Sequence, residues 1–155
     1  MDYTFYPYLG IGDLRFGMSP DDIRNGIGRA PEQASLRSPA TKTRKEYYVS
    51  LGLLVEFDDK DLCSSFTIMR GGKLLFDSVD LMQMNHAELK RFLLIKGYPI
   101  VEEDSGLTCD ALGLTSWMSD LADEDAVDDR QEFECLFIFR RGHYEYMKAL
   151  IEASC

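Results

Sequence analysis

The chain has 155 residues, of which 45% are hydrophobic and 28% charged, and its 27 acidic and 17 basic side chains give a formal net charge of −10. This composition is typical of one globular domain with a single core, and it excludes an intrinsically disordered chain. The negative field disfavours nucleic acid and anionic membranes and favours a basic protein partner, although acidity also serves solubility alone.

The first residues have no basic stretch followed by an apolar run, and no segment has the roughly 18 consecutive apolar residues of a membrane span. We therefore expect a cytoplasmic protein with no membrane contact. The cysteines form no C-x-x-C pair, so zinc spacing is absent and we interpret the thiols as reduced. They are Cys63, Cys109, Cys135 and Cys155.

Three glycines surround a predicted short strand at residues 14–16. They do not match a phosphate-binding loop, because the third glycine of that motif and the G-K-[ST] sequence are both missing. We interpret them as turn residues, which favour glycine for its backbone freedom. They are Gly10, Gly12 and Gly17.

The next predicted element is a helix of about two turns capped by Ser19. Pro20 fits its first position, Ile27 continues its apolar stripe, and Gly28 fits the left-handed residue at its end.

The same pattern returns 66 positions after Ser19, with Asn85 as the cap. Glu88 completes a capping box, and Gly97 marks the end of this second helix.

Residues 53–57 and 62–69 predict a hairpin, because a polar turn separates two strand-like runs. Residues 115–118 predict another strand. Residues 133–140 are apolar on both alternating faces, which predicts a central strand covered on both sides. The spacing of the last apolar residues predicts a closing helix at about 143–154.

We therefore predict an α+β fold in a single domain, residues 1–155, with helices packed on an antiparallel sheet. Both predicted helices precede a Leu-Gly-Leu sequence, at residues 51–53 and 112–114, and an apolar strand that ends in arginine and glycine. This order indicates two divergent helix-plus-strands repeats, at about 10–76 and 80–142. Short generic motifs also produce such parallels by chance.

Two segments are predicted to be loops. Residues 35–45 hold a basic cluster of Arg37, Lys42, Arg44 and Lys45, and residues 119–132 are densely acidic. The acidic loop is either a solvated linker or a docking surface for a basic protein. Aromatic residues beside the loops are either core residues or interface anchors. The candidate partner-binding residues are Asp120, Asp123, Glu124, Asp125, Asp128, Asp129, Trp117, Tyr47 and Tyr48.

No catalytic, cofactor-binding or metal-binding residue is assigned. His86 and His143 are the only imidazoles that could activate a cysteine, both fall at predicted helix starts, where the helix dipole disfavours the imidazolium, and we expect polar surface side chains there. The sequence has no G-x-S-x-G elbow, and the acidic loop lacks the glycine and ligand spacing of an EF-hand. A carboxylate pair among 27 acids has no specific signature.

The segment from Gly10 to Ile23, with Gly28 and Pro31, resembles the opening of small immunity proteins from bacterial polymorphic toxin and contact-dependent inhibition systems. The segments 47–57 and 137–144 are also similar to that group. Similar helix entries occur in β-lactamase inhibitor protein and in outer-membrane assembly lipoproteins, whose helix-plus-strand repeats this chain also resembles. The resemblance implies a cytosolic inhibitor that binds a cognate toxin domain, often a nuclease, and it transfers no individual contact residues.

We therefore expect a non-enzymatic immunity protein that needs no cofactor and is a monomer or weak dimer when free. An acidic secretion chaperone or adaptor is the alternative in the same class, and a small hydrolase that uses unassigned carboxylates is the less favoured one.

Overall fold

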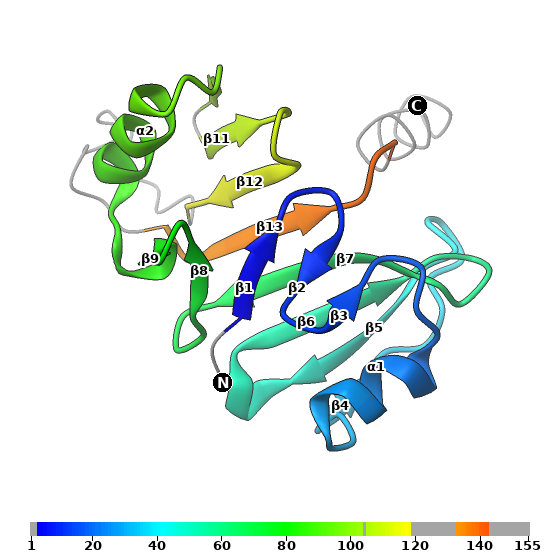
Figure 1. Ribbon diagram of the computed structural model, residues 1–155. Helices are drawn as coiled ribbons and strands as arrows, with labels where there is room; N and C mark the ends of the chain where they lie inside the picture. The colour runs from blue at the N-terminus through cyan, green and yellow to red at the C-terminus, as the bar shows by residue number, and fades with distance from the viewer. Residues whose placement is uncertain (1–2, 104, 119–132, 143–155) are drawn as a thin grey trace.

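The computed structural model describes residues 3–103, 105–118 and 133–142 (Figure 1). In these residues the fold is α+β, with two α-helices and two mostly antiparallel sheets around one core, which confirms the predicted class. The predicted closing helix at about 143–154 and the acidic loop at 119–132 lie outside the described residues.

The larger sheet has eight strands in the order β10-β11-β12-β13-β7-β6-β5-β4, and every neighbouring pair is antiparallel. The predicted hairpin is β6 and β7, and the predicted central strand is β13, which lies between β12 and β7. The strands are β4 Gln33–Ala34, β5 Arg44–Tyr48, β6 Leu53–Phe57, β7 Cys63–Met69, β10 Val101–Glu103, β11 Gly106–Cys109, β12 Leu114–Trp117 and β13 Cys135–Phe139.

The smaller sheet has five strands in the order β3-β2-β1-β8-β9, and its only parallel pair is β1 with β8. At Gly10, φ is +153° and an added Cβ would lie 2.0 Å from the carbonyl oxygen of Leu14 in the neighbouring strand, so this position of β2 requires glycine. The strands are β1 Tyr3–Tyr6, β2 Gly10–Ile11, β3 Leu14–Arg15, β8 Leu74–Phe76 and β9 Val79–Asp80, and the short 3₁₀ turns are η1 Val49–Leu51 and η2 Leu81–Gln83.

Both helices begin and end where the sequence predicts. Helix α1, Pro20–Ile27, has the Ser19 side chain accepting a hydrogen bond from the Asp22 amide, and it ends at Gly28 with φ +86°. Helix α2, His86–Ile95, has a full capping box between Asn85 and Glu88. Each cap satisfies backbone amides that the first helical turn leaves unpaired.

The helices and the smaller sheet lie against one face of the eight-stranded sheet. Figure 1 shows α1 beside β4 and β5, α2 beside β11 and β12, and β1 to β3 in front of β6 and β7. Each helix buries two apolar residues, Ile23 and Ile27 from α1 and Leu89 and Leu93 from α2. These side chains and the inward-facing strand residues form one continuous core.

The strand order is symmetrical about the β7–β13 pair, with β6, β5 and β4 on one side and β12, β11 and β10 on the other. Matching glycines lead into β6 and β12, Gly52 with φ +63° and Gly113 with φ +69°. The Gly52 carbonyl accepts a hydrogen bond of 2.7 Å from the Met69 amide, and the Gly113 carbonyl accepts one of 3.1 Å from the Phe139 amide. The two sides of the sheet therefore share their strand order and a backbone contact.

Candidate functional site

The face of the eight-stranded sheet that points away from the core carries one row of paired residues that crosses all eight strands. Every residue in the row is half-buried or exposed, whereas in the six inner strands, β5 to β7 and β11 to β13, the strand neighbours on the core face are buried. Strand geometry explains this alternation, because successive side chains point to opposite faces. The row runs Gln33, Tyr47, Leu54, Thr67, Phe137, Thr115, Thr108 and Val101.

A second, shorter row lies beside the first and contains Met69, Cys135 and Trp117. Met69 is 38% exposed and Trp117 is 43% exposed, so the largest side chains of this row meet solvent. We call these eleven residues of the two rows the open face. It carries apolar, aromatic and uncharged polar side chains and no charged one, and such a composition is typical of the centre of a protein interface.

The structure brings two of the predicted contact residues, Trp117 and Tyr47, to the open face from opposite sides of the β7–β13 pair. Tyr48 is different, because it is fully buried and belongs to the core. Its assignment to the contact surface is therefore corrected. Burial raises the pKa of its hydroxyl to about 12.

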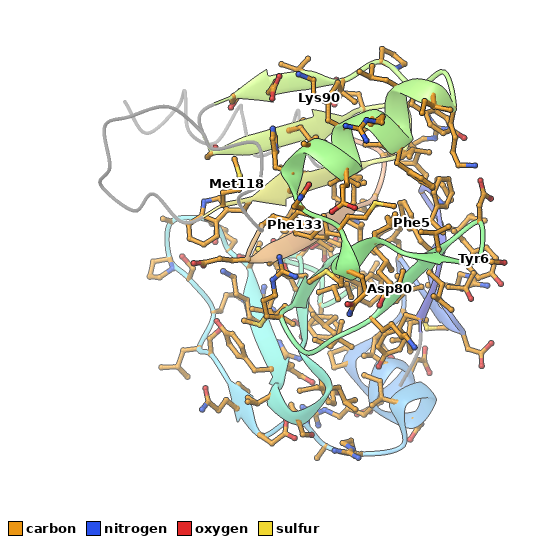
Figure 2. The ribbon with its side chains drawn as sticks, turned by 90° about the vertical axis from the view of Figure 1, so that its left-hand side faces the viewer. Phe5, Tyr6, Asp80, Lys90, Met118 and Phe133 are labelled. Atoms are coloured by element: carbon orange, nitrogen blue, oxygen red, sulfur yellow. The ribbon has the colours of Figure 1, made fainter. Side chains whose placement is uncertain are left out.

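The six predicted acidic contact residues, Asp120, Asp123, Glu124, Asp125, Asp128 and Asp129, lie outside the described residues. Their segment leaves β12 after Met118 and returns at Phe133, and both of these residues are buried (Figure 2). The Glu134 amide donates a hydrogen bond of 2.8 Å to the Trp117 carbonyl. The chain on both sides of the acidic segment is therefore fixed next to Trp117.

The sequence missed five apolar members of the open face, which are Leu54, Met69, Val101, Cys135 and Phe137. Strand β13 is central as predicted, but the expectation that both of its faces are covered is wrong for part of its length. Phe139 is buried at 4% exposure, whereas Phe137 is only half-buried. The alternation of Phe66, Thr67 and Ile68 in β7 was the available signal, since it places a polar residue opposite Phe137.

The predicted basic cluster is largely neutralised by internal ion pairs. The Arg37 and Arg44 guanidinium groups both bind the Asp61 carboxylate, and this pairing lowers the pKa of that carboxyl. Arg44 also reaches the fully buried Glu46, which accepts two hydrogen bonds from Arg24 at 3.0 and 2.9 Å. These contacts join α1, β5 and the β6–β7 turn, and they leave few free cations to bind a phosphate.

His86 is not the surface residue that the sequence predicts, because its side chain is fully buried. Its Nε2 atom lies 2.7 Å from Glu102 Oε1, and Lys90 Nζ lies 2.8 Å from Glu102 Oε2. These two partners lower the pKa of the Glu102 carboxyl. The contact joins the start of α2 to the edge strand β10, so one ring nitrogen of His86 has a structural partner, while its buried Nδ1 atom has none among the described residues. His143 lies outside the described residues.

The described residues contain no group of three or more His, Cys, Asp or Glu side chains that could hold a metal ion. Cys63, Cys109 and Cys135 are free thiols, and burial raises the pKa of each of them.

A groove of about 480 Å³ on the outer side of α2 is lined by Ala87, Lys90, Arg91, Leu94 and Ile95. No described helix is both long enough and apolar enough to span a bilayer.

Comparison with family models, with curated proteins and with solved structures finds no match for this chain.

Proposed function

We propose that this protein is a binding protein of the immunity type, which neutralises a cognate toxin domain by covering it with the open face. The observation that carries this proposal is the set of large side chains that the described strands place on the open face. Trp117 and Met69 are exposed, and Phe137 and Tyr47 on the same face are half-buried. Aromatic residues and methionine are enriched in interface centres, and contiguous exposed apolar patches mark interaction sites.

The backbone under the open face is well suited to rigid recognition. Its central residues lie on β6, β7, β12 and β13, which are hydrogen-bonded to a neighbouring strand on both sides. A surface that is ordered before binding loses little conformational entropy on binding. This supports contact with a folded domain.

The charge of the chain supports a basic partner. Its net charge is −10. The acidic segment, residues 119–132, begins two residues after Trp117, and its first carboxylate is Asp120. Carboxylates around an apolar contact surface speed the approach of a cationic protein and favour it over acidic competitors. The same carboxylates would meet the lysine and arginine side chains with which a nuclease grips phosphate.

We further propose that the chain arose from two divergent copies of one helix-plus-strands unit. The symmetrical strand order and the glycine contacts support this, and so do the apolar side chains at corresponding core positions: Ile23 and Leu89, Ile27 and Leu93, Leu53 and Leu114, Phe66 and Leu136, Ile68 and Ile138. At corresponding positions of the open face, one unit has a large apolar or aromatic side chain where the other has a threonine. These pairs are Tyr47 and Thr108, Leu54 and Thr115, and Phe137 and Thr67. Packing constrains the core positions, whereas an asymmetric partner would favour divergence on the open face.

The test is binding to the purified product of the adjacent gene, together with protection of cells that express that product. We expect nanomolar affinity that weakens with salt, and a loss of at least about tenfold for Trp117→Ala, as for an interface hot spot. Ile95→Ala is the matched control, because Ile95 is 77% exposed in the α2 groove, away from the open face. Equal effects of the two variants, or no protection, would contradict the proposal, and a stable homodimer that holds an extended segment would indicate a secretion chaperone.

A further inference from the structure

Two buried polar atoms on neighbouring strands lack hydrogen-bond partners among the described residues. They are Glu56 Oε1 on β6 and Ser65 Oγ on β7. Glu56 is 6% exposed and Ser65 is 0% exposed, and the two residues are register partners. They lie on the same side of the sheet as the open face, one row beyond Leu54 and Thr67. A carboxylate oxygen left without a hydrogen bond at this depth is costly, so it calls for an explanation.

A partly exposed cation lies beside this pair. Lys45 Nζ lies 3.9 Å from Glu56 Oε2, a loose contact, and the Lys45 side chain is 43% exposed. The register of β6 against β7 shifts between Glu56 and Phe57, which marks a bulge at this point of the sheet. Bulges often lie beside functional sites, where they redirect a side chain. Burial raises the pKa of Glu56 more than Lys45 lowers it, so the pair with Lys45 compensates the burial only in part.

We propose that Glu56 and Ser65 form an acceptor site for the cationic nitrogen of a lysine or arginine side chain from the bound partner. The inference rests on the proposed function, since the site borders the open face. Glu56 Oε1 and Ser65 Oγ both accept hydrogen bonds, which suits a guanidinium or ammonium donor. Lys45 turns outward as the partner's cation enters, because two cations repel each other beside one carboxylate. In the free protein the acceptors are unsatisfied, and the bound partner satisfies them.

The first test is the stability of the free protein. A group kept for binding destabilises the unbound fold, so Glu56→Met, which fills similar volume, raises Tm by about 3 °C or more. Glu46→Met is the matched control, since Glu46 is buried but paired with two arginines, and its Tm falls. A fall in Tm for Glu56→Met would assign Glu56 a structural role and overturn the acceptor site.

The second test uses small probes, N-acetyl-L-arginine amide and N-acetyl-L-lysine amide, with the neutral N-acetyl-L-citrulline amide as control. In NMR titrations the two cations shift the amide signals of Glu56 and Ser65, more strongly in Lys45→Ala, and citrulline does not. Glu56→Gln abolishes the shifts. If the cations shift neither amide in the wild type or in Lys45→Ala, the inference is wrong.

The third test separates this inference from the proposed function, and it uses the adjacent gene product of the binding experiment. Glu56→Gln weakens that binding at least about tenfold, as expected when one partner of a buried charge pair is removed. If Glu56→Gln binds like the wild type while Trp117→Ala does not, the acceptor site is wrong and the open face still binds the partner. If neither variant changes binding, both proposals are wrong.

Discussion

Thr67 and Phe137 face each other across β7 and β13, in the middle of the row that crosses the eight-stranded sheet. Both are only half-buried, whereas Phe66 and Ile68 beside Thr67 are fully buried on the core face. The central strands therefore have one packed side and one side that is still partly accessible.

The open face is expected to contribute less to stability than the core face of the same strand. Phe137→Thr, which copies its partner Thr67, costs at most about 1.5 kcal/mol, whereas Leu136→Ala costs about 2 to 5 kcal/mol because it leaves a cavity. Urea denaturation of both variants measures the difference. Comparable losses would mean that Phe137 is a core residue and that the open face is smaller than described.

Glu46 is expected to be essential for the stability of the fold. Glu46→Gln leaves two arginines, Arg24 and Arg44, without their buried carboxylate and costs about 3 kcal/mol. The exposed Glu103→Gln on β10 is the control, for which we expect no measurable change. An unchanged urea midpoint for Glu46→Gln would show that the ion-pair network adds nothing to stability.

Gly113 is expected to tolerate alanine less well than Gly71. Both have a positive φ, of +69° and +97°, but a Cβ on Gly113 would lie 2.8 Å from the Phe139 carbonyl oxygen, while one on Gly71 would meet nothing within 4 Å. Gly71→Ala should cost about 1 kcal/mol from backbone strain, and Gly113→Ala about 2 to 4 kcal/mol from strain and overpacking. Thermal denaturation checks the order, and equal costs would argue against the close contact.

Two carboxylates should give opposite pH dependences. Burial raises the pKa of Glu56, so its favourable contribution is complete below the unfolded pKa of about 4.5 and is lost as pH rises through the folded pKa. Glu56→Gln therefore matches the wild type near pH 4 and is more stable at pH 7. Hydrogen bonds from Ser50 and Val49 lower the pKa of Glu32, so its contribution is present above pH 4.5 and is lost in acid.

Glu32→Gln should therefore be less stable than the wild type at pH 7 and equal to it in acid. Tm measured from about pH 2 to pH 7 for the wild type and both variants gives the comparison, since the carboxyl of Glu32 must be protonated in the folded state at the acid end. Parallel curves for Glu56→Gln and the wild type would show that Glu56 does not titrate differently in the folded state.

The sequence predicts the local elements well because their signals are local. Ser19 and Asn85 each lie within a few residues of the amides that they cap, and both caps form as expected. The burial of His86 could not be predicted from neighbouring residues, because its partner Glu102 is 16 residues away and on another element.

The candidate site was predictable only in part, for a related reason. Tyr47 and Tyr48 are adjacent in one strand, so one must face the core and the other the open face. The register that decides between them depends on pairing with Leu54 and Leu53 in the next strand. The open face as a whole combines strands from both halves of the chain, and no single segment of the sequence displays it.

The two edges of the eight-stranded sheet bear on how the protein behaves in a concentrated solution. Strand β4 has only two residues, and β10 has three exposed residues, two of which are Glu102 and Glu103. Short or charged edges discourage the addition of foreign strands, which is the usual route to fibrous aggregates. An apolar platform bounded in this way can stay free and dispersed until its own target arrives.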